Sequence, residues 1–276
     1  MNTSNPLDSK VNTQNLASHD ETNDLLKGIC AYQVWGTLGW HDIKQRYRRS
    51  VLGPFWFTLS TAILVLVLGA LYSTLLNQEI HNYLPYLAVG LVVWQYLAAS
   101  VTEGCTAFIG STYLIKQIRL PLTIHVCRIA WRNFAILLHS LPVVVIMLII
   151  FGKWPTIEFL LLPLGLFILL LHGVWLGVVL GVLSARFRDI SPIVTNLVQV
   201  AFFFTPVMWS PEILKDRAWV AHYNPLYHMI ELIRAPITGR PILWESWAWS
   251  IGFLFIGFFF AQFLMRRYRN RVPYWL

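Results

Sequence analysis

The sequence predicts an all-α integral membrane protein with six transmembrane helices, and three observations carry this prediction. Hydrophobic residues make up 57% of the 276 residues and charged residues only 12%, about half the charged fraction of a soluble domain. Six apolar stretches each approach the roughly 20 residues that a helix needs to cross the hydrocarbon core. The 21 Lys and Arg residues gather in alternate connections between those stretches, as expected for loops on one side of a membrane.

The first 26 residues differ in composition from everything that follows. They are polar, rich in Asn, Ser and Thr, and contain no apolar segment. Such a composition cannot bury enough apolar surface to fold, and it does not match a secretory signal peptide. We therefore expect residues 1–26 to be a disordered cytoplasmic tail and residues 27–276 to form the transmembrane domain.

The segment 38–52 is predicted to be an amphipathic helix that lies in the cytoplasmic interface of the membrane. At helical spacing, its apolar face carries Trp40, Ile43, Tyr47 and Val51, and its polar face carries Asp42, Gln45, Arg46 and Arg49. Helices of this kind place cations toward anionic headgroups, so membrane lipids are an expected partner. The Gly-Pro pair at 53–54 then ends the helix and turns the chain into the first span.

The six spans are predicted from the apolar runs. They cover residues 54–76, 84–101, 131–151, 159–183, 193–209 and 247–265. The connection 210–246 between the last two is too polar and too rich in Pro to span, yet apolar enough to contact lipid. We expect it to form a pair of short re-entrant helices, because backbone at that depth must be covered by protein or line a water-filled cavity.

The distribution of cations predicts the orientation. With the N-terminus inside, 16 of the Lys and Arg residues lie on the inner side and 5 on the outer side. Because short cytoplasmic loops carry the excess of Lys and Arg, both termini are expected to be cytoplasmic. The net charge of +8 is thereby assigned to membrane orientation, and no nucleic-acid partner is expected.

Catalytic and nucleotide-binding motifs are absent from the sequence. The only Gly-Lys pair, at 152–153, is followed by Trp, so the chain has no P-loop and any ATP hydrolysis must occur on a partner. No Asp, Glu, Lys or Arg lies mid-span, which disfavours an ion-coupled transporter. His228 and Glu231 stand at i and i+3 and are a possible metal pair, but no second ligand cluster accompanies them. A satisfied surface pair is the favoured interpretation, and no metal is expected.

Two further features of the spans have ordinary structural interpretations. His139 and His172 are expected to be neutral and hydrogen-bonded within the bundle. Gly173, Gly177 and Gly181 form a tandem G-x-x-x-G, which lets helices approach closely. The sequence leaves open whether that contact is made within one chain or across a dimer.

Four motifs in order resemble one family. They are "RYRRSVLGPFWF" (46–57), "ARFRDI" (185–190), "FFFTPVMWSPE" (202–212) and "NPLYHMIELIR" (224–234). They are similar to motifs of the membrane subunits of polysaccharide-exporting ABC transporters, the permeases for O-antigen, teichoic acid and capsule. The resemblance covers about residues 25–272.

The resemblance implies an assembly in the bacterial inner (cytoplasmic) membrane. Two copies of the chain would form a channel for an undecaprenyl-linked glycan, and each would rest on an ATP-binding subunit that holds ATP and Mg²⁺. No cofactor is expected in this chain itself. A short helix in the second inner loop would seat in a groove of the ATPase. The residues assigned to this docking are Ile115, Lys116, Ile118, Arg119 and Leu122. A generic positive loop is the alternative.

Three further sites are hypotheses. Arg46, Arg48 and Arg49 are placed to pair with a lipid-linked pyrophosphate at the inner headgroup level; the alternative is lipid anchoring alone. Aromatic faces suit a sugar chain in a channel, although lipid-facing and packing roles are equally ordinary for such residues. The channel aromatics are Tyr72, Trp175, Phe202, Phe203 and Phe204, and the periplasmic gate is assigned to Pro206, Pro211, Asn224 and Pro225.

The predicted function is a transport subunit and not an enzyme, with O-antigen favoured over capsule or teichoic acid as cargo. The main alternative is a membrane enzyme of envelope glycan synthesis, which should show converging catalytic residues at the membrane edge. A secondary transporter is disfavoured by the uncharged spans and by the absence of an evident repeat.

Overall fold

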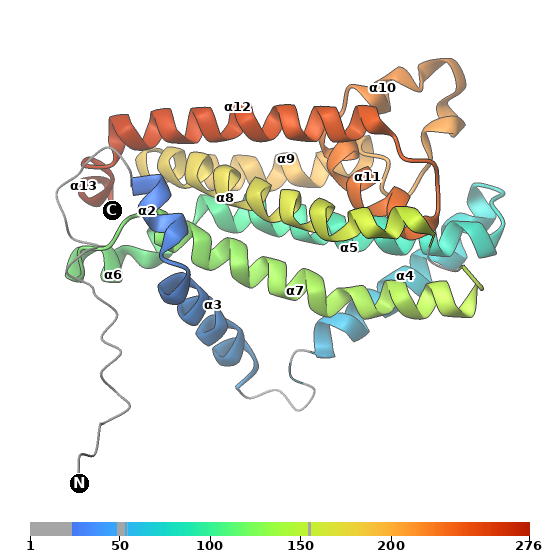
Figure 1. The fold of residues 1–276 in the computed structure, drawn as a ribbon, viewed down its shortest axis with the longest axis horizontal. Coiled ribbons are helices and arrows are strands. Elements are labelled where there is room, and N and C mark those ends of the chain that lie inside the picture. Colours follow the sequence, from blue (N-terminus) through green and yellow to red (C-terminus); the bar gives the residue numbers. More distant parts are fainter. Residues whose placement is uncertain (1–23, 49–52, 54, 154–155) are drawn as a thin grey trace, which may run out of the picture.

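In the computed structural model, which describes residues 24–48, 53, 55–153 and 156–276, the chain is an all-helical bundle without strands in those ranges (Figure 1). The α-helices are α2 (Asp24–Cys30), α3 (Tyr32–Tyr47), α4 (Phe55–Leu75), α5 (Ile80–Cys105), α6 (Thr112–Gln117), α7 (Thr123–Ile150), α8 (Leu162–Arg186), α9 (Ile190–Phe204), α10 (Trp219–His222), α11 (Pro225–Thr238), α12 (Trp244–Tyr268) and α13 (Val272–Trp275). Short 3-10 helices are η2 (Ile109–Ser111), η3 (Ile157–Leu161) and η4 (Pro211–Arg217).

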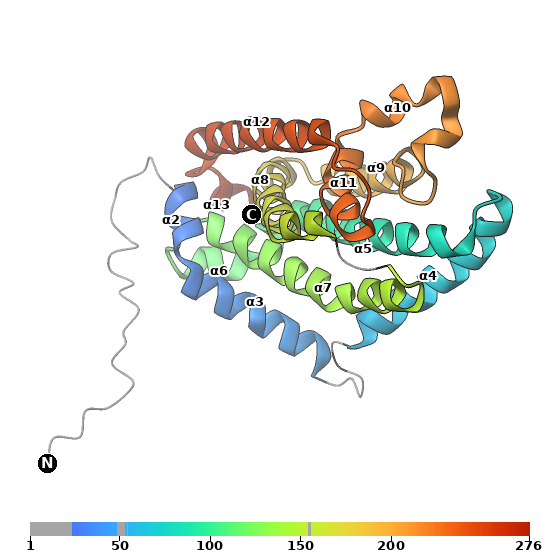
Figure 2. The ribbon, with the colours of Figure 1, turned by 45° about the vertical axis from the view of Figure 1, so that its right-hand side comes forward.

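The long helices alternate in direction between two ends of the molecule (Figures 1 and 2). One end, here called the α6 end, gathers α2, α6, α13 and the turn between α8 and α9. The opposite end, here called the α10 end, gathers η4, α10, α11 and the turns that join α4 to α5 and α7 to α8. The first described residues and the C-terminus therefore lie at the same end.

Five stretches of the described chain are long and apolar enough to cross a membrane. They are Phe55–Leu75, Ile80–Cys105, Thr123–Ile150, Ile157–Arg186 and Trp244–Tyr268. The prediction of a fifth span at 193–209 corresponds to α9, which has only 15 residues. At 1.5 Å per residue, α9 is about 22 Å long, shorter than a ~30 Å hydrocarbon core.

Several helices extend beyond the predicted apolar runs. The second predicted span, 84–101, is part of a helix over Ile80–Cys105, and the third, 131–151, is part of one over Thr123–Ile150. The added turns carry charged side chains that hydropathy excludes, among them Glu103 and Arg128. These side chains are paired with one another or with α3 (below), so the helix continues through them.

Helix α5 is the centre of the bundle and packs against α4, α7, α8, α9 and α11. Close approach to α8 depends on glycine, because a Cβ on Gly104 would lie 2.9 Å from the backbone Cα of Gly177. A Cβ on Gly173 would lie 2.6 Å from the Tyr96 hydroxyl, and Gly181 faces Phe108. The tandem G-x-x-x-G of α8 therefore makes its contact within one chain.

The N-terminal part departs from two predictions. Residues 24–26, which the composition assigned to the disordered tail, belong to α2, and Asp24 is buried; residues 1–23 lie outside the described residues. The helix predicted at 38–52 is α3 over Tyr32–Tyr47, and residues 49–52 also lie outside the described ranges.

The buried face of α3 differs from the predicted apolar face. Trp40 is exposed and Ile43 is buried, whereas Asp42, assigned to the polar face, is half-buried and pairs with Arg128 of α7. The reason is that α3 packs along α7 through Gly39, where a Cβ would lie 2.9 Å from the Trp131 ring. Tertiary contact with α7 thus decides the orientation of α3.

Candidate functional site

Helix α11 at the α10 end is largely buried, and its buried side chains include His228, Glu231 and Arg234. It begins at Asn224, whose side chain accepts a hydrogen bond from the backbone N–H of Leu226 at 2.9 Å, with Pro225 in the first turn. It ends at Gly239, which has φ +66° in the left-handed region that favours glycine. The predicted Asn-Pro helix start is confirmed.

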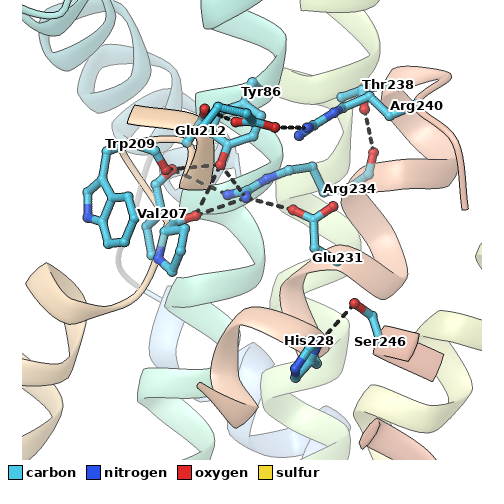
Figure 3. A network of polar contacts seen from close by, with 12 residues as sticks. Tyr86, Val207, Trp209, Glu212, His228, Glu231, Arg234, Thr238, Arg240 and Ser246 are labelled. Carbon is cyan, nitrogen blue, oxygen red and sulfur yellow. Dashed lines mark hydrogen bonds and ion pairs between the residues drawn. The ribbon is translucent and has the colours of Figure 1, made fainter. Parts of the chain in front are cut away.

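Arg234 of α11 is fully buried and holds three segments together (Figure 3). Its Nη1 donates to Glu231 Oε1 at 2.9 Å, to the Tyr86 hydroxyl at 2.8 Å and to the Pro206 carbonyl at 2.8 Å. Its Nη2 donates to the Val207 carbonyl at 3.3 Å, and its guanidinium lies 3.9 Å from the Tyr86 ring centroid. A buried cation with a buried carboxylate and two carbonyls is compensated, and it fixes the loop after α9 against α5 and α11.

A second ion pair lies above this cluster at the surface of the α10 end (Figure 3). Arg240 Nη2 donates to Glu212 Oε1 at 3.0 Å. Burial acts to raise the pKa of Glu212, but the hydrogen bond from Ser210 and the charge of Arg240 outweigh it and lower that pKa. Burial likewise acts to lower the pKa of Arg240, and the nearby carboxylates of Glu231 and Glu212 raise it. Both side chains are therefore charged at neutral pH.

Two cavities meet at this ion pair. The larger, about 550 Å³, is lined by residues of the α4–α5 turn and the start of α5, the α7–α8 turn, η4 and the end of α11. The smaller, about 290 Å³, lies between η4, α10, α11 and the start of α12. Glu212 and Arg240 line both cavities.

His228 and Glu231, the possible metal pair of the sequence, do not act together. His228 Nε2 lies 2.7 Å from the His222 carbonyl, which can only accept, so this nitrogen carries the proton. Its Nδ1 then accepts from Ser246 Oγ at 2.9 Å. Glu231 pairs with Arg234, and both side chains are buried, so the predicted surface pair is wrong. No group of three metal-ligating side chains occurs within the described part of the chain.

At the α6 end, a row of alternating acidic and basic side chains connects α3, α5 and α7. Asp42 binds Arg128 through both carboxylate oxygens, with Arg128 Nε at 2.6 Å from Oδ2, and lies 3.7 Å from Arg132 Nη1. Arg132 pairs in turn with Glu103, whose other oxygen lies 4.0 Å from Arg46 Nη1. These ion pairs link α3 to α5 and α7.

A cavity of about 230 Å³ opens beside Arg46. Its wall is mostly apolar, with Phe57 among the lining residues, and its polar side chains besides Arg46 include Gln95, Glu103, Asn133 and Ser140. Asn133 is buried, and neither atom of its amide has a hydrogen-bond partner among the described residues. A cavity of this size with such polar groups has room for a hydroxyl-bearing group or several water molecules.

Asp24 ties the α6 end together and was not identified from the sequence. Its carboxylate accepts hydrogen bonds from the backbone N–H groups of Leu122 and Thr123, both at 3.2 Å, and lies 3.0 Å from Arg269 Nε. It thus caps the start of α7, which carries no capping side chain of its own.

Of the three predicted pyrophosphate-binding arginines, the structure describes Arg46 and Arg48. Arg46 lies 5.2 Å from the Phe57 ring and near Glu103. Arg48 is exposed in the turn after α3, and Arg49 lies outside the described residues.

The predicted channel aromatics fall into two groups. Trp175 donates to His172 Nδ1 at 2.8 Å and packs against Gly257 of α12, Phe202 packs against Trp94, and Tyr72 packs on the main core. These three are packed within one chain. Phe203 and Phe204 of α9 are 65% and 63% exposed.

The predicted docking residues are not all presented outward. Leu122 is buried and Ile115 packs against the same core cluster, whereas Ile118 is 50% exposed. Lys116 and Arg119 are also exposed. The face predicted to seat in a groove is therefore reduced to Ile118 and the two cations.

Of the predicted gate residues, Pro206 accepts a hydrogen bond from Arg234 through its carbonyl. Pro211 starts η4, and Asn224 and Pro225 start α11. The structure brings them together at the α10 end. Arg234, one of the five cations predicted to lie on the outer side, is the centre of that cluster. The apolar neighbours of Arg234 and the Glu231 at i−3 were the signal for a buried pair.

Residues 33–238 match the family described as "ABC-2 type transporter". The chain belongs to the ABC-2 type transporter family. It is similar to an "O-antigen export system permease protein RfbA" of Myxococcus xanthus, with 29% identity over 197 residues that cover 70% of this chain and 76% of the relative. Two proteins of Klebsiella pneumoniae with the same name are 26% and 25% identical, each covering 68% of this chain and 74% of the relative.

The ABC-2 match spans most of the bundle, from α3 to the end of α11. The matched residues include the row of ion pairs at the α6 end and the Arg234 cluster at the α10 end. As an ABC-2 family member with several apolar spanning helices, the chain is a multi-pass membrane subunit of a transporter.

Proposed function

We propose that this chain is the channel subunit of an ATP-driven exporter that moves a lipid-linked polysaccharide from the cytoplasm to the periplasm. The observation that carries the proposal is the ABC-2 family match together with three relatives named as O-antigen export permeases. O-antigen is therefore the favoured cargo; capsular polysaccharide and teichoic acid are the related alternatives.

In this proposal the chain crosses the inner membrane six times, with α9 as the short fifth crossing and both termini in the cytoplasm. The alternating helix directions support it, since α9 runs from the α6 end toward the α10 end and packs against α5 and α8 (Figure 1). The cations support the orientation, because the α6 end holds most of the Lys and Arg and the α10 end few. Helix α11 is then the main re-entrant element, covered by α5, α8 and α12.

The channel is proposed to form between two copies of the chain. Support comes from α9, which has no buried residue in the single chain. Its exposed surface includes the amides Asn196 and Gln199 as well as Phe203. Exposed amides on a membrane helix are better accommodated by another helix or a water-filled path than by lipid. A second copy facing α9 would provide both.

Transport would be driven by two copies of a separate ABC ATP-binding subunit that holds ATP and Mg²⁺, as membership of the family implies. The exposed residues Ile118, Lys116 and Arg119 at the α6 end would contact that subunit. The pyrophosphate of an undecaprenyl-linked glycan would bind Arg46, Arg48 and Arg49, next to the cavity beside Arg46. The Arg234 cluster would hold the periplasmic gate loops in register.

The proposed binding of pyrophosphate by Arg46, Arg48 and Arg49 can be tested separately. We expect the triple substitution of Arg46, Arg48 and Arg49 to Gln to reduce export at least tenfold while membrane insertion is unchanged. Export is measured as polymer at the cell surface, and insertion as the amount of chain in the membrane fraction. Gln45→Ala, an exposed amide on the same helix, is the control. Unchanged export in the triple variant would remove the arginines from the mechanism.

The transport function itself is tested by depletion of the chain in cells, followed by analysis of lipid extracts. We expect full-length polyprenyl-linked polymer to accumulate, because synthesis continues while export stops. The competing function, a membrane enzyme of glycan synthesis, predicts short precursors and no long polymer. That second outcome would refute the proposal.

A further inference from the structure

A cavity lies at the α10 end, where several connections between helices meet. Its lining comes from the α4–α5 turn with the first turns of α5, the α7–α8 turn, η4 with the residue before it, and the end of α11 with Arg240 after it. The lining residues are Gln78, Asn82, Tyr83, Pro85, Tyr86, Lys153, Ser210, Glu212, Ile213, Thr238 and Arg240. Its volume of about 550 Å³ is within the roughly 300–1,000 Å³ of small-molecule sites.

The polar groups of this cavity are held in place by one another. Lys153 Nζ donates to Asn82 Oδ1 at 2.8 Å, and Asn82 Nδ2 donates to Glu79 Oε2 at 3.2 Å. On the opposite wall, Glu212 is fixed by Ser210 and by Arg240. The lining thus offers ammonium, guanidinium and amide donors beside carboxylate and amide acceptors.

Two tyrosines of the lining are held by hydrogen bonds. The Tyr83 hydroxyl donates to the Met208 carbonyl at 2.6 Å, and the Tyr86 hydroxyl donates to the Trp209 carbonyl at 3.0 Å. Buried Arg234 donates to the Tyr86 hydroxyl. A lining that is already ordered in this way lowers the entropy lost when a ligand binds.

The mixture of charges selects the class of ligand. The lining carries two cations, Lys153 and Arg240, and one carboxylate, Glu212. A phosphate could pair with Lys153, but it would also meet the Glu212 carboxylate, which neutralises Arg240 and repels anions. A sugar both donates and accepts hydrogen bonds through its hydroxyls, and its C–H faces suit apolar contacts such as Pro85 and Ile213. The composition of the lining therefore matches a neutral, hydroxyl-rich ligand better than an anion.

We propose that this cavity binds one or two sugar units of the exported polymer on the outer face of the subunit. The proposal rests on the proposed function, which puts the α10 end outside and supplies a glycan. The Arg240–Glu212 pair separates this cavity from the 290 Å³ cavity behind it. An exposed ion pair of this kind contributes little to stability, so its opening would join the two cavities for a longer saccharide.

The test uses the purified full-length chain in nanodiscs and lipid-free oligosaccharides cut from the surface polysaccharide of the source strain. Binding is measured by saturation-transfer NMR and calorimetry. We expect saturable binding that weakens about tenfold in Gln78→Ala/Asn82→Ala, because each lost hydrogen bond reduces affinity about 3- to 10-fold. Arg217→Ala, an exposed η4 side chain outside the cavity, should bind like the wild type.

Inorganic phosphate and Glu212→Gln separate a sugar site from an anion site. A sugar site predicts no competition by phosphate and weaker oligosaccharide binding in Glu212→Gln. Competition by phosphate together with tighter phosphate binding in Glu212→Gln would overturn the proposal in favour of an anion site. No saturable binding of oligosaccharides by the wild-type chain would also overturn it. An unchanged melting temperature in each variant excludes misfolding as the cause.

The depletion experiment above keeps this proposal distinct from the proposed function. If long polymer accumulates on depletion but the purified chain binds no oligosaccharide, the transport function stands and only the sugar site fails. If depletion yields short precursors alone, the transport function fails whatever the binding result.

Discussion

Replacement of Arg234 by Met should destabilise the protein more than any substitution of an exposed cation. Arg234 is 0% exposed and Glu231 is 3% exposed, with 2.9 Å between Nη1 and Oε1. At an effective dielectric constant of about 20, two unit charges at this distance attract by about 6 kcal/mol. The desolvation of both ions offsets most of that attraction, but removal of one partner leaves a buried charge uncompensated, at a cost of about 3–5 kcal/mol.

The carbonyl groups of Pro206 and Val207 lose their donor in the same variant. Each adds about 1 kcal/mol to the loss, so Arg234→Met should lower the free energy of unfolding by about 5–7 kcal/mol. Glu231→Gln keeps an acceptor for Arg234 and should lower it by about 3 kcal/mol. In the double variant no buried charge remains, so its loss should be at least about 2 kcal/mol smaller than the sum.

The assay is equilibrium unfolding of the purified chain in mixed micelles with increasing SDS, followed by tryptophan fluorescence. Arg217→Gln is the control, because Arg217 is exposed in η4 and should change stability by less than about 0.5 kcal/mol. A loss below about 1 kcal/mol in Arg234→Met, or full additivity in the double variant, would refute the reasoning about a coupled buried pair.

Three further predictions concern other parts of the structure. Asp24→Ala should lower stability by about 2 kcal/mol, because it removes the cap of α7 and leaves a partner of Arg269 missing; Asp24→Asn should lose less, and equal losses in the same SDS titration would contradict the capping role. Gly104→Val should lower the free energy of unfolding by about 1–3 kcal/mol, since the valine side chain would meet the α8 backbone at Gly177. Gly252 has open space around it, so Gly252→Ala should leave stability unchanged. Equal effects in the two variants would argue against tight α5–α8 packing. Burial lowers the pKa of His228 below its ordinary 6.5, so as the pH falls the unfolded chain protonates His228 before the folded chain does. The stability contributed by neutral His228 is therefore complete above pH 6.5 and is lost as the pH falls below that value. The difference between the melting temperatures at pH 5 and pH 7 should be smaller in His228→Gln than in the wild type, and an unchanged difference would exclude His228 as its source.

The sequence was sufficient to predict those features that depend on local hydropathy and local caps. Long apolar runs located α4, α5, α7, α8 and α12, because a spanning helix must satisfy its backbone internally. The Asn224 cap and the Pro225 start of α11 were also predictable, since both act within one turn.

Features that depend on contacts between distant segments could not be predicted. Asp24 looked like part of a polar tail, because its partners lie about 98 residues further along the chain. Asp42 fell on the polar face of α3 by periodicity, but its pairing with Arg128 turns that face toward α7. Leu122 seemed available for docking until the fold buried it.

Reconstitution would show whether this chain provides the path for a lipid-linked glycan. Vesicles would contain the chain, its ATP-binding subunit and a lipid-linked glycan of the source strain, with a glycan-cleaving enzyme added outside. We expect ATP to make a growing fraction of the glycan resistant to the enzyme, and vesicles without this chain to show no such protection. Protection that is equal with and without the chain, or absent with ATP in the complete system, would mean that the chain is not the path.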